Sequence, residues 1–314
     1  MQENTKFPTW LLAVEKAERS KIKPQARDFF HKSLACYPHF HEVFMSCPRT
    51  SEIGILNTYE LSVLKEHYDY DNLFHFVVAN ISEIFHYQYV YQVRELALAM
   101  HGALEDGSFY AAAILNRSIF EVVCTNYYTF RRIEESFEHS LRLLQEATKT
   151  KSEVEQQKII AKHYEILYEI FSLAYRANSA SSIDWAVHLK QFGFKEKLPE
   201  PSKPIHVNTA IADIEKVSKL PLMKVYALMS EFVHPNFGSK TLVINTKRPY
   251  QECMDVLILG DNAGNHEAAL FYIDQLSESL YYTLTLACSL HDRSVKFLDA
   301  IFRFIPTSDN RILH

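Results

Sequence analysis

The chain has 314 residues, a net charge of −5 at pH 7 and a hydrophobic share of 47%, a composition normal for a globular protein with a large core. Its 7 glycines argue against Gly-rich phosphate loops, and its negative charge argues against nucleic-acid binding over a broad basic surface, although a local basic pocket stays compatible. The 5 cysteines are scattered and odd in number, which favours free thiols over a disulfide framework.

The start of the chain has no targeting pattern. Residues 1–10 are polar and lack the apolar stretch of a secretory signal. No run of about 18 apolar residues is free of charges, so we expect no membrane-spanning helix. We therefore expect a cytoplasmic protein. Residues 8–19 and 24–35 have the pattern of two helices, and 36–56 is expected to be loop-like because it contains prolines and a glycine.

Helical periodicity dominates the rest of the chain. The expected helices cover residues 58–68, 71–104, 108–146, 152–177, 208–218, 221–233, 265–290 and 291–304. Gly102 and Gly107 are expected to bracket a turn between two of them. Two short β-branched runs, 240–247 and 253–259, are typical of a hairpin.

The predicted fold class is therefore all-α, a multi-helix bundle with a small β-hairpin near 240–260. We expect one helical domain over 1–314, with a peripheral N-terminal segment, 1–56. Residues 195–207 contain three prolines and several charges, which is typical of a linker or a surface loop. We interpret this stretch as a proline-rich loop within one domain; a boundary between two domains is the alternative.

The first candidate site residues lie in the apolar helix 108–130. Arg117 and Glu121 are one turn apart on the same face. A helix that is apolar all round is buried, and a buried charge is costly unless it is paired. The two residues therefore form either an internal ion pair that stabilises helix packing or part of a functional site.

The second set of candidates lies on helix 221–233. Tyr226, Ser230 and His234 recur at spacings of four, which makes a polar stripe among apolar residues. We expect Ser218 to cap this helix and Pro235 to end it. A histidine at a helix C-terminus is favoured in its charged form by the helix dipole, but a simple C-terminal cap explains the pattern equally well.

These two segments carry a resemblance to a known family. Residues 117–121 read Arg-Ser-Ile-Phe-Glu, and residues 226–236 read Tyr-Ala-Leu-Met-Ser-Glu-Phe-Val-His-Pro-Asn. They resemble uncharacterised bacterial helical domains that are similar to the HEPN superfamily, over residues 109–130 and 222–240. The resemblance implies a metal-independent RNase, often of a defence or toxin system, with RNA or a nucleotide as ligand. It also implies a homodimer, and some members are non-catalytic.

The chemistry of RNA cleavage assigns roles to the candidates. A base is needed for the 2′-hydroxyl and a cation for the charge that develops on phosphate, and we expect His234 and Arg117 to supply them. Tyr226 and Ser230 would orient the phosphate, and Asn236 is a further binding candidate. Glu121 would weaken the attraction of Arg117 for an anion, so it is expected to hold Arg117 in place or to engage His234.

A second Arg–His string matches the catalytic signature of the family. Six residues separate Arg94 from His101, which puts both on one helix face. The string lies early in the bundle, whereas the family places its motif late. The sequence leaves open whether the two form a functional motif or share an amphipathic face by coincidence.

Metal chemistry is not expected, and neither is a cofactor. Cys36, His39, His41 and Cys47 fall close together, but their spacing matches no common zinc module. The alternative to an RNase is a non-catalytic helical binding or scaffold protein, in which the Arg/Glu/His cluster is structural or binds a small ligand. The sequence does not decide whether the protein is an enzyme.

Overall fold

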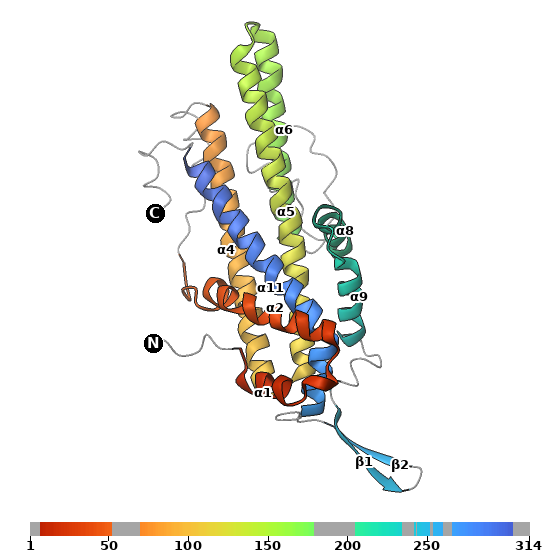
Figure 1. Cartoon of the computed structure of the whole chain (residues 1–314). Coiled ribbons are helices and arrows are strands. Elements are labelled where there is room, and N and C mark those ends of the chain that lie inside the picture. Colours follow the sequence, from red (N-terminus) through yellow and green to blue (C-terminus); the bar gives the residue numbers. More distant parts are fainter. Residues whose placement is uncertain are drawn as a thin grey trace. The chain divides into compact units, whose positions relative to one another are not determined.

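The computed structural model describes residues 7–51, 70–178, 205–233, 242, 244–251, 254–259 and 266–303. This part of the chain is mainly α-helical (Figure 1), which confirms the predicted all-α class. By their internal contacts the residues form two compact units. Unit 1 consists of residues 1–48, 89–124 and 211–291, and unit 2 of residues 49–88, 125–210 and 292–314.

The helices differ greatly in length. The α-helices are α1 (Thr9–Ala17), α2 (Pro24–Phe40), α4 (Tyr70–Glu105), α5 (Phe109–Lys149), α6 (Glu153–Asn178), α8 (Val207–Ser218), α9 (Leu222–Val233) and α11 (His266–Phe302), and the short helical turns are η1 (Arg19–Lys21) and η2 (His41–Met45). Two helices were expected where α11 is continuous. That prediction was wrong because no proline or glycine interrupts this stretch.

The N-terminal segment is more helical than expected. α2 contains Pro38 and runs to Phe40, and the π-helical turn η2 follows directly, so the predicted loop is wrong for residues 36–45. The amide of Ser46 donates to the carbonyl of His41 at 2.9 Å and closes η2. Phe40 and Phe44 are fully buried in unit 1. Their burial stabilises the helical path although Pro38 lacks an amide hydrogen.

A tight turn joins α4 to α5. The amide of Ser108 donates to the carbonyl of Ala103 at 2.7 Å, and that of Gly107 donates to Leu104 at 3.2 Å. This pair of bonds is a Schellman motif, which requires a left-handed residue at its centre, and Gly107 has a φ of 69°. Gly102, by contrast, lies inside α4 and not at the edge of a turn.

The core of unit 1 forms around α5, α9 and α11. Phe109 at the start of α5 packs against Tyr272, with ring centroids 5.2 Å apart, and Phe232 of α9 packs edge-on against Phe271 at 6.0 Å. The α1 helix joins this core because the indole of Trp10 donates to the carbonyl of Leu104 at 3.2 Å. α11 is therefore held against both α5 and α9 within the unit.

Unit 2 has its own buried contacts. The ring of Phe297 packs edge-on against Phe130 at 5.3 Å and against Phe137 at 5.6 Å. His86, which is buried, lies 2.6 Å from the hydroxyl of Ser294. Within this unit, the aromatic contacts join α5 to α11, and the contact of His86 joins α4 to α11.

The described residues also include two paired strands, β1 (Ile244–Gln251) and β2 (Met254–Leu259), which are antiparallel. β1 starts and ends later than the run 240–247 that the sequence indicated. A register shift lies between Pro249 and Gln251, consistent with a proline that cannot donate to the ladder.

Most of the predicted proline-rich loop is not among the described residues. Residues 195–204 of the proline-rich stretch lie outside the described residues, and 205 and 206 lead directly into α8. Among the helices that the structure describes, none has the length and low charge needed to cross a bilayer.

Candidate functional site

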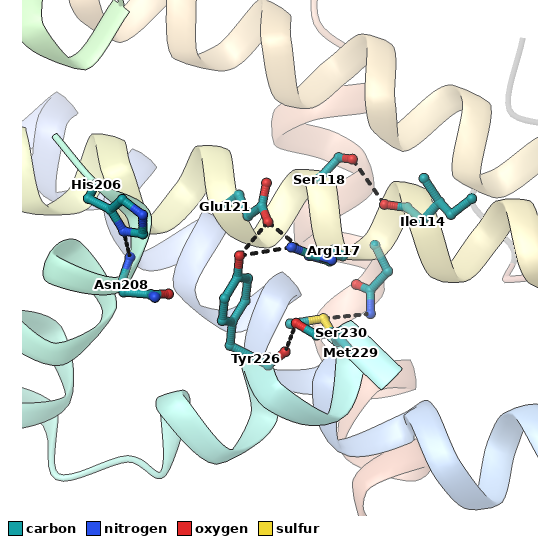
Figure 2. A network of polar contacts seen from close by, with 10 residues as sticks. Ile114, Arg117, Ser118, Glu121, His206, Asn208, Tyr226, Met229 and Ser230 are labelled. Atoms are coloured by element: carbon teal, nitrogen blue, oxygen red, sulfur yellow. Dashed lines mark hydrogen bonds and ion pairs between the residues drawn. The ribbon is translucent and has the colours of Figure 1, made fainter. Parts of the chain in front are cut away.

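Three of the predicted site residues meet in unit 1 and are named here the Arg117 cluster: Arg117, Glu121 and Tyr226. The Nε of Arg117 donates to Glu121 Oε1 at 2.8 Å, and its Nη2 donates to the Tyr226 hydroxyl at 3.0 Å. The Tyr226 hydroxyl donates in turn to Glu121 Oε1 at 2.7 Å. Figure 2 shows the three side chains turned toward one another between α5 and α9.

The cluster lies at the edge of the core. The Arg117 side chain is 16% exposed and that of Glu121 is 36% exposed. The guanidinium carbon of Arg117 lies 5.0 Å from the centre of the Tyr226 ring, a cation–π contact. The same ring stacks on buried Phe120, with centroids 6.3 Å apart and planes 16° apart. The cluster therefore packs on two aromatic rings, and its most exposed charged side chain is that of Glu121.

The turn before α9 sets the direction of that helix. The Glu215 carboxylate on α8 accepts the amide hydrogen of Met223 at 2.7 Å and so satisfies a donor in the first turn of α9. Ser218, the predicted cap, ends α8 and accepts instead from the Leu220 amide at 3.3 Å. That prediction was wrong because a residue on the preceding helix reaches the free amide, while Lys219 takes a left-handed φ of 60°.

The other end of α9 is also bound to α5. The hydroxyl of Tyr110 donates to the carbonyl of Val233 at 3.4 Å. Val233 is the last described residue of α9, and the predicted site residues His234 and Asn236 lie outside the described residues. The contact holds the C-terminal end of α9 against the helix that carries Arg117 and Glu121.

Ser230 lies one turn beyond Tyr226 but is engaged locally. Its hydroxyl donates to the backbone carbonyl of Tyr226 at 2.9 Å (Figure 2). Such a bond to the preceding turn is common for serine in a helix interior. Ser230 is therefore close to the cluster in sequence and in space, while its proton is directed along the helix and not to Arg117 or Glu121.

The protonation of the cluster follows from its surroundings. Burial lowers the pKa of the Arg117 guanidinium, but the bond to Tyr226 and the charge of Glu121 outweigh this effect, so the pKa is raised. Burial raises the pKa of the Tyr226 hydroxyl, and its bond to Glu121 acts in the same direction. At neutral pH, Arg117 is a cation and Tyr226 is a hydrogen-bond donor.

A buried residue beside the cluster was not among the predicted site residues. The amide nitrogen of Asn116 donates to the Ser279 hydroxyl at 3.0 Å and lies 3.8 Å from the sulfur of Met229. Asn116 is fully buried, and its side-chain oxygen has no hydrogen-bond partner in the described part of the chain. An asparagine in an apolar helix, next to Arg117, was the only sequence signal for this contact.

The second Arg–His string has separate partners. The Tyr37 hydroxyl lies 2.7 Å from His101 Nδ1, and the two rings stack. Arg94 pairs instead with its neighbour Glu95. Within the described ranges no hydrogen bond or ion pair joins Arg94 to His101. Each residue of the string thus has its own partner: Glu95 for Arg94, and Tyr37 on α2 for His101.

The cysteine and histidine residues near the end of α2 do not converge. Cys36 lies 3.7 Å from the Thr285 hydroxyl, and the Cys47 thiol donates to the Phe44 carbonyl at 3.0 Å. His41 contacts Ser46 at 3.0 Å. Among the residues that the structure describes, no group of three or more His, Cys, Asp or Glu side chains could hold a metal ion.

No protein-family model matches the chain, and searches of curated proteins and of solved structures find no significant match. The chemistry of the Arg117 cluster is therefore the structural basis for a functional proposal.

Proposed function

We propose that this protein is a HEPN-like nucleic-acid-acting protein that binds RNA at the Arg117 cluster and cleaves it without a metal ion, as an RNase of a bacterial defence or toxin system. One observation supports this proposal above the others. The two segments that carry the resemblance lie far apart in the sequence, and their polar residues Glu121 and Tyr226 are hydrogen-bonded over 2.7 Å. An arrangement of this kind is what a shared site requires.

The groups of the cluster suit an RNA ligand. Arg117 is a fixed cation because its guanidinium is held by Glu121 and Tyr226 at 2.8 and 3.0 Å. A cation held in advance stabilises charge that develops on phosphate without having to reorganise. In this proposal Arg117 carries that role, His234 removes the proton of the 2′-hydroxyl, and Ser230 and Asn236 contact the ligand.

The second candidate function is a non-catalytic binding or scaffold protein, and one feature of the cluster favours it. Glu121 neutralises much of the charge of Arg117 because its carboxylate lies 2.8 Å from the guanidinium. A neutralised guanidinium attracts an anion less strongly than an isolated one does. In that case the cluster stabilises the packing of α9 on α5, or it binds a small ligand by hydrogen bonds.

Incubation of the purified full-length chain with labelled single-stranded RNA in the presence of EDTA distinguishes the two functions. The proposal expects cleavage by the wild type and a loss of about a hundredfold or more in His234→Ala, since a general base contributes at least that much. His139→Ala is the matched control because His139 is exposed on α5 and is expected to leave cleavage unchanged.

Circular dichroism and thermal unfolding establish that each variant is folded. Binding of RNA without cleavage by the folded wild type would favour the non-catalytic function. Neither binding nor cleavage, with intact folding, would contradict the proposed function as a whole.

A further inference from the structure

The two oxygens of the Glu121 carboxylate have different surroundings. Oε1 accepts two hydrogen bonds, from Arg117 Nε at 2.8 Å and from the Tyr226 hydroxyl at 2.7 Å. Oε2 makes no hydrogen bond or ion pair within the part of the chain that the structure describes. In Figure 2 the second oxygen points away from Arg117 and Tyr226. One oxygen is thus fully used inside the protein, and the other is not.

The Glu121 side chain is also more exposed than that of Arg117. Glu121 is 36% exposed, whereas its partner Arg117 is 16% exposed. The guanidinium is in addition covered by the Tyr226 ring at 5.0 Å. Of the charged groups in the cluster, the carboxylate is therefore the one that solvent and ligand reach more readily.

The carboxylate is also held in one orientation. Both of its partners are themselves fixed, since Arg117 lies on the same helix one turn away and the Tyr226 ring is stacked on Phe120. An acceptor that is positioned in advance loses little entropy when it binds a ligand, and its geometry can discriminate between ligands. Tyr226 stays a donor at neutral pH, so this arrangement is maintained.

An exposed and oriented carboxylate oxygen accepts a hydrogen bond from a ligand hydroxyl. The 2′-hydroxyl of RNA is such a donor, and it is the group that distinguishes RNA from DNA. Building on the proposed function, we infer that Glu121 Oε2 accepts a hydrogen bond from a ribose 2′-hydroxyl, and that Tyr226 is a positioning residue that orients the carboxylate. This hydroxyl belongs to a nucleotide that flanks the cleaved one, because the single proton of the attacking 2′-hydroxyl goes to His234 in the proposed function.

Two properties of the ligand follow from this assignment. A 2′-fluoro strand keeps the sugar shape of RNA but has no 2′ donor, so its affinity should be about tenfold lower, the contribution of one hydrogen bond to a charged group. The preference for RNA over 2′-fluoro RNA should also be insensitive to salt, whereas the overall affinity should fall as salt screens the phosphate contacts.

The test is fluorescence anisotropy with labelled RNA and 2′-fluoro RNA of one sequence, measured on the full-length chain at two salt concentrations and in EDTA. The His234→Ala background limits cleavage, and the wild type on ice serves as a second measurement. We expect the wild-type site to prefer RNA about tenfold, and Glu121→Gln to bind RNA only as tightly as 2′-fluoro RNA. Glu138→Gln, an exposed glutamate on α5, removes the same charge and should keep the full preference.

Tyr226→Phe provides a variant that leaves the ion pair of Arg117 and Glu121 intact. Its preference for RNA over 2′-fluoro RNA should lie between those of the wild type and Glu121→Gln, because the carboxylate loses one of the two bonds that orient it. It also keeps the inference testable if Glu121→Gln does not fold.

The outcomes separate the inference from the proposed function. Equal binding of RNA and 2′-fluoro RNA by the wild type, or an unchanged preference in folded Glu121→Gln, would overturn the role of Glu121 while leaving RNA binding in place. Binding of neither strand by the folded wild type would overturn the proposed function and this inference together.

Discussion

The hydroxyl of Tyr226 on α9 donates to the Glu121 carboxylate on α5 at 2.7 Å, across 105 residues of sequence. This bond connects the two helices that carry the candidate site residues. Arg117 donates hydrogen bonds to both residues, so the three side chains form one closed network.

Removal of this hydroxyl should have a small and specific effect on stability. Tyr226→Phe keeps the stack on Phe120 and the ring below Arg117 but leaves one bond to Glu121 unmade. We expect the free energy of unfolding to fall by about 1 kcal/mol, the net contribution of a typical hydrogen bond. Urea unfolding measures it. Tyr110→Phe loses only a long bond of 3.4 Å and should change stability less, so an equal or larger loss there would contradict the prediction.

Arg117 should be sensitive to the shape of its side chain and not only to its charge. Arg117→Lys retains the charge but cannot donate to Glu121 and Tyr226 through one rigid planar group. We expect Arg117→Lys and Arg117→Met both to lower the free energy of unfolding, by about 1 and 2 kcal/mol, because the Arg117 side chain is only 16% exposed and its donors are bonded within the protein.

The matched control for Arg117 is Arg132→Met. Arg132 is 40% exposed and pairs with Glu135, and exposed pairs contribute little. Chemical denaturation of the three variants should therefore place Arg132→Met within about 0.5 kcal/mol of the wild type. A Lys variant of Arg117 as stable as the wild type would show that charge alone suffices.

The two glycines near the turn between α4 and α5 should respond in opposite directions to alanine. A Cβ at Gly102 meets no heavy atom within 4 Å, and the residue lies inside α4, so Gly102→Ala should raise the free energy of unfolding by about 0.5–1 kcal/mol. Gly107 has a φ of 69°, so Gly107→Ala should lower it by a similar amount or more. Thermal unfolding of both variants tests the contrast, and a destabilised Gly102→Ala would contradict it.

His101 should make stability depend on pH in one direction. Burial lowers the pKa of its imidazole from the ordinary value of 6.5, while the Glu105 carboxylate opposes this effect. The unfolded chain therefore takes up a proton at a higher pH than the folded chain does. The contribution of neutral His101 is fully present above pH 6.5 and is lost as pH falls from there through the lowered pKa.

Urea unfolding between pH 8 and pH 5 measures this dependence. His101→Gln should flatten the decrease below about pH 6.5. Glu105→Gln should make it steeper, since it removes the group that raises the pKa of His101. A decrease of the same slope in His101→Gln would assign the effect to other groups.

Local patterns in the sequence account for much of the fold and for the pairing of two of the three residues in the Arg117 cluster. Apolar residues at helical spacing predicted the long helices, because burial of one face is what stabilises a helix in a protein. Arg117 and Glu121 could be paired from their spacing alone. The same local reasoning failed at Pro38, where buried Phe40 and Phe44 outweigh the preference of proline for a helix end.

The partner of that pair was decided only by tertiary structure. Tyr226 reaches Glu121, and Asn116 reaches Ser279, because α9 and α11 both pack on α5. Ser230 follows Tyr226 by four residues in the same polar stripe, yet its hydroxyl donates to a carbonyl of its own helix. Periodicity shows which face of a helix is buried or polar, but not which other helix that face will meet or in what register. Those depend on the packing of side chains that lie far apart in the chain, which is the physical reason the cluster appears only in the folded protein.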